Sequence, residues 1–138
     1  MEEREKKAQE IYMEYQMLEQ HIQQRQKQLE MVTHQILELN TTTSSLDEYN
    51  KIKNGSSVFV PLSSGIFAKA NIAETSELLV NVGANIAVKK DIPSIKKLIQ
   101  NQIEELIKIQ KQMVNDLEKI TNNAAQVEMK LRGLVSEN

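Results

Sequence analysis

The sequence predicts an α+β chain in which two long helices form an antiparallel coiled-coil hairpin, joined by two central β-hairpins. Apolar residues recur at steps of four and three before residue 54 and after residue 92, which is typical of coiled coils. They recur at every second position only between residues 56 and 91, which is typical of strands. The chain is also poor in aromatic residues, glycine and proline, as long helices are.

These patterns divide the chain into three parts. We expect an N-terminal coiled-coil helix over residues 1–54, two β-hairpins acting as an oligomerisation hub over 55–91, and a C-terminal coiled-coil helix over 92–138. Residues 1–50 carry a net charge of −5 and residues 93–138 a net charge of +1. This difference favours pairing of the two helices with each other, although exposed ion pairs are individually weak. Both termini would then lie at the same end of the coiled coil.

The first helix is expected from Glu3 to about Lys53, because this stretch lacks proline and glycine. Asn54-Gly55 follows, and these residue types adopt the left-handed conformation that ends helices. Arg25 is either a seam residue whose charge reaches solvent or one that fixes the register of the pair. The seam positions, which also include the polar Thr43, are Ala8, Ile11, Tyr15, Leu18, Ile22, Arg25, Leu29, Val32, Ile36, Leu39, Thr43, Leu46 and Asn50.

The second helix is expected to begin at Asp91-Ile92-Pro93-Ser94, with Asp91 as its cap. Two consecutive steps of four, from Ile109 through Met113 to Leu117, predict a local unwinding of the supercoil there. Ile103 and Ile107 widen the apolar stripe near the hairpins. The seam positions are Ile95, Ile99, Gln102, Leu106, Ile109, Met113, Leu117, Ile120, Ala124, Val127, Leu131 and Leu134.

Four short strands are expected in the middle of the chain, separated at Ser63-Ser64-Gly65, Glu74-Thr75-Ser76 and Gly83-Ala84-Asn85. Strands this short bury too little to stand alone and leave open edges, while both helices are occupied by one another. We therefore expect oligomerisation, with strands from several subunits closing a β-barrel platform. The residues expected at these contacts are Val58, Val60, Leu62, Ile66, Phe67, Ala68, Ala70, Ile72, Leu78, Val80, Val82, Ile86 and Val88. Phe59, Leu79 and Ala87 make the opposite face partly apolar as well.

Apolar residues near both termini fall at the free tip of the expected coiled coil. Taken alone, the pattern slightly favours side chains that only complete the coil. The alternative is a partly exposed surface where methionine adapts to varied partners. The candidate residues are Ala8, Ile11, Tyr12, Met13, Tyr15, Met17, Val127, Met129, Leu131, Leu134 and Val135.

Composition and spacing argue against several other functions. The chain has no cysteine, and His21 and His34 lie too far apart on one helix to suggest a metal site. No catalytic or phosphate-binding motif is present, so we expect no enzymatic activity and no cofactor. A net charge of −2 excludes a strongly basic surface for phosphate backbones but not weak contact, and we expect no nucleic-acid partner. The charged start MEEREKKAQE lacks the apolar core of a signal peptide, and no membrane span is expected, so we expect a cytoplasmic protein.

The phrases VFVPLSSGIFAKANI and LLVNVGANIAVKKDI, set between two long helices, resemble the α-type subunit of archaeal prefoldin over essentially the whole chain. This resemblance implies a hexamer of two α and four β subunits with a double β-barrel platform. It implies an ATP-independent chaperone that captures non-native polypeptides at the coiled-coil tips and delivers them to a cytosolic chaperonin. The alternative function is a structural coiled-coil scaffold or tether that multimerises through its β segment.

Overall fold

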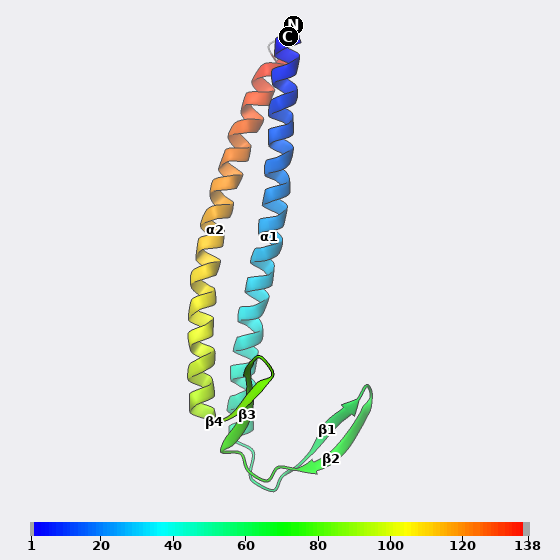
Figure 1. Ribbon diagram of the computed structural model, residues 1–138, viewed down its shortest axis with the longest axis vertical. Helices are drawn as coiled ribbons and strands as arrows, with labels where there is room; N and C mark the ends of the chain where they lie inside the picture. The colour runs from blue at the N-terminus through cyan, green and yellow to red at the C-terminus, as the bar shows by residue number, and fades with distance from the viewer. Residues whose placement is uncertain (1, 137–138) are drawn as a thin grey trace. The chain divides into compact units, whose positions relative to one another are not determined.

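The computed structural model describes residues 2–136, and residues 1, 137 and 138 of the two predicted helical segments lie outside that range. The elements are α1 (Glu2–Asn50), β1 (Ser57–Ser63), β2 (Ile66–Asn71), β3 (Glu77–Gly83), β4 (Ile86–Asp91) and α2 (Ile92–Ser136), in the predicted order (Figure 1). Two compact units can be described separately. One comprises the described residues up to Ile36 together with those from Glu105 onward, and the other comprises Leu37–Glu104.

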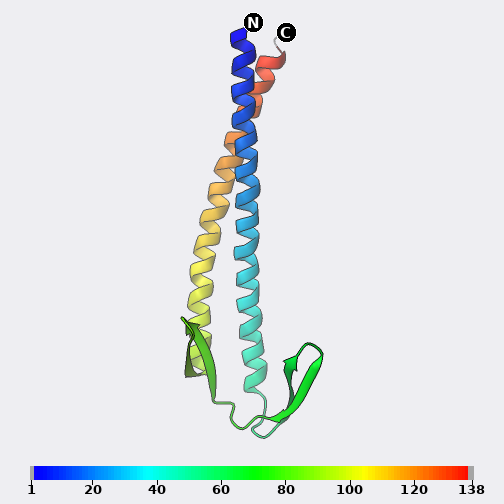
Figure 2. The same cartoon turned by 45° about the vertical axis from the view of Figure 1, so that its right-hand side comes forward.

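In the first unit, α1 and α2 lie side by side in opposite directions, as both views show (Figures 1 and 2). Their contact uses the narrow apolar seam, in which the α1 residues are half-buried while Ala124 and Val127 of α2 are buried. Polar contacts also join the helices in the described part of this unit. Arg4 Nη2 donates to the carbonyl oxygen of Leu134 at 3.0 Å, and Gln110 Nε2 donates to Thr33 Oγ1 at 3.0 Å.

The polar seam residues of α1 behave differently from one another. Arg25 is exposed, so its charge stays in solvent. Thr43 is half-buried, and its hydroxyl donates to the carbonyl of Leu39 on its own helix at 3.1 Å. The side-chain contact between Gln110 and Thr33 crosses the seam instead. The sequence did not indicate this contact, because the apolar Ile109 next to Gln110 was the predicted seam residue.

The predicted seam of α2 is wrong at two positions. Gln102 is exposed while Ile103 is only 5% exposed, and Ile109 is 49% exposed while Gln110 is half-buried. The two consecutive steps of four therefore run through Ile95, Ile99 and Ile103, not through Ile109, Met113 and Leu117. Apolar character alone selected Ile109, but the rotation of the helix face after Ile103 places Gln110 against α1.

In the second unit, α1 ends at Asn50, slightly before the predicted Lys53. The chain tightens there, because Ile52 N donates to the carbonyl of Tyr49 over three residues at 3.0 Å. Tyr49 is half-buried, while the predicted seam residue Asn50 is exposed, so the prediction is wrong at this position. Gly55 takes a positive φ of 88°, as predicted for the segment that follows the helix.

The start of α2 is the best-packed part of the described chain. Ile92, Ile95, Ile99 and Ile103 are all buried, and Lys96 forms an ion pair with Asp47 of α1. Asp91 caps the helix as predicted, accepting a hydrogen bond from Ser94 N at 2.9 Å. Hydrogen bonds from the side chain and backbone of Ser94 lower the pKa of the Asp91 carboxyl below its ordinary value of 3.8.

The β-segment consists of two separate antiparallel two-stranded sheets, β1–β2 and β3–β4. Each strand of the second hairpin begins 20 residues after its counterpart in the first, and the registers correspond. Val60 faces Ala68 across the first pair, and Val80 faces Val88 across the second. Both hairpins also carry one register irregularity just before the turn. The two hairpins are therefore variants of one structural module.

The turns fall where the composition predicted them. Gly65 has a φ of 77° in the first hairpin, while Ala84 and Asn85 have φ values of 52° and 60° in the second. Positive φ is easy for glycine and tolerable for asparagine, but it is strained for alanine. Asn81 Oδ1 supports this turn by accepting a hydrogen bond from Gly83 N at 3.0 Å.

Candidate binding and assembly surfaces

We define the hairpin surface as the apolar side chains of β1–β4 that the chain leaves exposed. Several of the predicted contact residues lie half-buried on one face, including Val58, Ala68, Leu78, Val80 and Val88. Both faces nevertheless expose large apolar groups. The exposed members are Phe59, Val60, Leu62, Ile66, Phe67, Leu79, Val82 and Ile86, with exposed fractions from 42% to 71%.

Open strand edges accompany this apolar surface. Each sheet has only two strands, so each strand has one edge without a partner within the described chain. Isolated edges and exposed aromatic or β-branched side chains are normally covered in a stable protein. Together they provide both backbone and side-chain groups for pairing with further strands.

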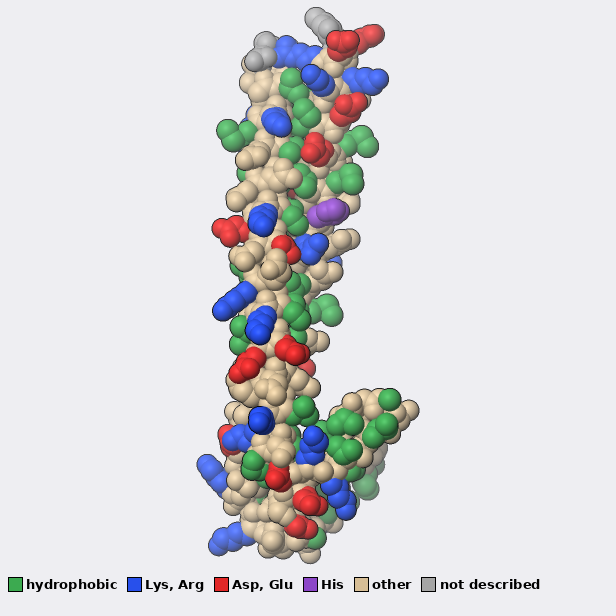
Figure 3. Space-filling model, turned by 60° about the vertical axis from the view of Figure 1, so that its left-hand side comes forward, with side chains coloured by type: hydrophobic (Ala, Val, Ile, Leu, Met, Phe, Trp, Pro, Cys, Tyr) green, Lys and Arg blue, Asp and Glu red, His purple; other side chains and the backbone are tan. Residues whose placement is uncertain are grey.

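We define the helix-end surface as the exposed apolar side chains near the start of α1 and the end of α2. Its members are Tyr12, Met13, Met17, Met129 and Val135, with exposed fractions from 49% to 73%. All of them belong to the tip set predicted from the sequence. Figure 3 shows apolar side chains of both helices standing among charged ones in this part of the molecule.

The other six residues of the tip set predicted from the sequence are buried or half-buried in the structure. Val127 is buried in the seam. Ala8, Ile11, Tyr15, Leu131 and Leu134 are half-buried between the helices. These residues complete the coiled coil, whereas the five exposed ones point to solvent and contribute little to packing.

Tyr15 combines a half-buried ring with a polar contact. Its hydroxyl donates to Glu19 Oε1 at 2.8 Å, and this hydrogen bond, with smaller contributions from partial desolvation and the Glu128 charge, raises the pKa of the phenol. Arg132 Nη2 donates to Glu128 Oε1 at 2.8 Å nearby on α2. Ion pairs this exposed stabilise little. They do keep the apolar side chains of this region surrounded by charge.

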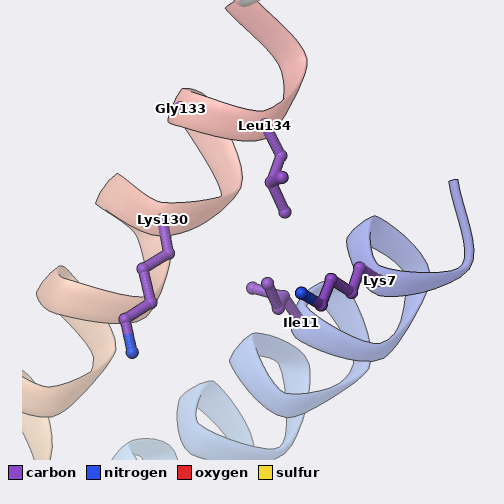
Figure 4. Close-up of a pocket in the computed structure, with 5 residues that line it drawn as sticks. All are labelled: Lys7, Ile11, Lys130, Gly133 and Leu134. Carbon is purple, nitrogen blue, oxygen red and sulfur yellow. The ribbon is translucent and has the colours of Figure 1, made fainter. Parts of the chain in front are cut away.

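The helix ends also form a cleft that the sequence did not reveal. Lys7 and Ile11 of α1 and Lys130, Gly133 and Leu134 of α2 line a volume of about 310 Å³ (Figure 4). The sequence did not mark Lys7 and Lys130 as site residues, because solvent-exposed lysines are common on helices. One signal was present: each lysine lies four residues before the apolar residue it accompanies, hence on the same helix face.

Within residues 2–136, no group of three His, Cys, Asp or Glu side chains is arranged to hold a metal ion. His21 and His34 are both exposed on α1. In the same range, neither helix holds an apolar stretch long enough to cross a membrane.

Two long antiparallel helices, two incomplete sheets and exposed apolar helix ends define a coiled-coil protein with β-hairpins. Residues 18–137 match the family model described as prefoldin subunit. The chain belongs to the prefoldin subunit family, whose members are chaperones without enzymatic activity.

The relatives are alpha-type subunits. The chain is 26% identical over 119 residues to prefoldin subunit alpha of Thermofilum pendens, covering 86% of this chain and 92% of that protein. It is 33% identical over 102 residues to prefoldin subunit alpha of Methanobrevibacter smithii, covering 74% of this chain and 64% of that protein. These matches confirm the predicted resemblance to the α type.

Solved structures show the same fold. The cryo-EM structure of filamentous PFD from Methanocaldococcus jannaschii matches with a TM-score of 0.68 and 18% identity, covering 94% of this chain and 99% of that chain. This likeness confirms the predicted fold class, with two long antiparallel helices and two central β-hairpins.

Proposed function

We propose that this chain is a subunit of an ATP-independent holdase that assembles through its hairpins and captures non-native polypeptides at its helix ends. The observation that carries the proposal is the exposed set Tyr12, Met13, Met17, Met129 and Val135. Three of these side chains are flexible methionines, Tyr12 is amphipathic and Val135 is aliphatic, and all five are at least 49% exposed. Exposed apolar groups of this kind bind other apolar chains without requiring one sequence.

The family supports the assembly that accompanies this function. The partners would be β-type prefoldin subunits in a complex of two α and four β chains, acting in the cytoplasm and handing clients to a cytosolic chaperonin. In this arrangement residues 55–91 form the hub and the helices of residues 1–54 and 92–138 present the client surface. The similar structure from Methanocaldococcus jannaschii is described as filamentous, so native mass with and without a β-type partner is the first measurement to make.

Capture is tested by diluting several unrelated denatured proteins into buffer with the assembled complex and no ATP. Stoichiometric suppression of aggregation supports the holdase. Unaltered aggregation favours the alternative of a structural scaffold or tether with a specific folded partner.

Deletion of residues 1–17 together with 127–138 separates the two surfaces. We expect capture to fall while the oligomer survives, because the hairpins are intact. Dissociation of the oligomer would show that the helix ends serve assembly instead.

A further inference from the structure

The cleft at the helix ends combines an apolar floor with a cationic rim. In Figure 4, Leu134 of α2 and Ile11 of α1 face each other across the gap, and the amino groups of Lys7 and Lys130 flank it. Both apolar residues are half-buried. An aliphatic side chain entering the gap would therefore replace water against two apolar surfaces.

Gly133 lines the cleft without a side chain of its own. A Cβ atom built at this position would meet nothing within 4 Å, so the space beside it is free. Glycine is less favourable than alanine inside a helix. A larger residue would therefore favour the helix and occupy part of the cleft, which makes this position useful for testing.

The two lysines are available to a ligand. Within residues 2–136, neither ammonium forms an ion pair, although carboxylates are common on both helices. An ammonium beside an apolar surface attracts a carboxylate that can approach while its neighbouring side chain is buried. The chemistry of the cleft is thus complementary to an aliphatic residue with acidic neighbours.

We infer that this cleft selects, among unfolded clients, aliphatic side chains flanked by aspartate or glutamate in extended polypeptide. The inference rests on the proposed holdase function and narrows its client class. It assigns Lys7 and Lys130 a direct role in choosing segments, while Ile11 and Leu134 contact the apolar group.

The probe is an unstructured, fluorescein-labelled Gly/Ser peptide that carries several leucines, each flanked by glutamate, with a matched peptide carrying glutamine instead. Several leucines are needed because single apolar contacts bind weakly and multivalency raises affinity. Binding to the full assembled complex is measured by fluorescence anisotropy. We expect the glutamate peptide to bind roughly three- to tenfold more tightly at low salt, as two exposed ion pairs allow. The preference should vanish at about 1 M salt, where the screening length is ~3 Å.

Two variants locate the effect. K7Q/K130Q should bring the affinity for the glutamate peptide down to that for the glutamine peptide, leaving the latter unchanged. The control K27Q/K108Q removes the same charge from exposed lysines elsewhere on α1 and α2, and should preserve the preference. Gly133→Leu should weaken binding of both peptides by occupying the cleft, with helix content by circular dichroism at least equal to that of the wild type.

Equal affinity of the two peptides for the wild-type complex, or an undiminished preference in K7Q/K130Q, would overturn this inference while leaving the holdase intact. Failure of the complex to suppress aggregation of any denatured protein would remove the proposed function itself.

Discussion

The hairpins and the helix ends both expose large apolar side chains, yet they differ in what the backbone offers. Phe59, Leu62 and Leu79 stand on two-stranded sheets whose edges carry unpaired amide and carbonyl groups. Met13 and Met129 stand on helices whose backbone groups are already hydrogen-bonded internally. Free strand edges impose a register through backbone hydrogen bonds on whatever joins them, whereas the helix backbone has no free groups to do so. We therefore expect similar apolar exposure to serve permanent assembly in the hairpins and capture of non-native chains at the helix ends.

The largest expected effect comes from charging the hairpin surface. The double variant Val80→Asp, Val82→Asp should abolish the oligomer, because two unpaired carboxylates would be buried on assembly at a cost of several kcal/mol each. Native mass spectrometry measures the result. Asn81→Asp on the same strand is the control, since it adds charge at an exposed polar position and keeps the oxygen that accepts from Gly83 N. An unchanged mass for the double variant would remove the hairpins from the assembly contact.

The next effect concerns the helix pairing that supports both regions. Ile103→Ala should lower the free energy of unfolding by about 2–4 kcal/mol, since this side chain is 5% exposed. Ile109→Ala should cost well under about 1 kcal/mol, because that side chain is 49% exposed. Urea denaturation followed by circular dichroism compares the two variants. Equal losses would contradict the seam position assigned by the structure.

Substitution of the exposed apolar side chains at the helix ends should change the free energy of unfolding little but should clearly weaken capture of denatured proteins. Replacing Tyr12, Met13, Met17 and Met129 by serine should reduce capture of denatured proteins several-fold, because the exposed apolar area is removed. Met31→Gln with Leu37→Gln is the matched control, since both side chains are at least 60% exposed on α1 but distant from its start. If the control loses as much capture as the variant, general helix hydrophobicity rather than the helix-end surface binds clients.

The smallest expected effect is the pH dependence of the cap that begins α2. The lowered pKa of Asp91 means that its capping contribution is fully present at neutral pH and is lost as pH falls below about 3.8 through the folded value. Asp91→Asn should keep the cap and remove this part of the acid dependence, while Asp91→Ala should lose the cap at every pH. Thermal melts between neutral and acidic pH distinguish the three proteins. Identical acid profiles for wild type and Asp91→Asn would contradict the assignment.

The sequence predicted the helices and strands well, because apolar residues recur at steps of three and four in the helices and at every second position in the strands. The strands, their three breaks and the Asp91 cap all follow from local composition and spacing. The seam of α2 was less predictable, because Ile109 and Gln110 differ by one position and only the partner helix decides which faces inward. The cleft was missed for a related reason. Lys7 and Lys130 are distant in the sequence, and only the antiparallel packing places them on the same opening.

We propose that assembly and capture reside in different parts of this chain. The most direct test dilutes a denatured protein into buffer with the assembled complex and follows its aggregation by light scattering. Native mass spectrometry of the same complex shows whether the oligomer is intact. For the serine variant of Tyr12, Met13, Met17 and Met129, we expect an unchanged number of subunits in the oligomer and a several-fold weaker suppression of aggregation. Full suppression by that variant, or loss of the oligomer, would contradict it.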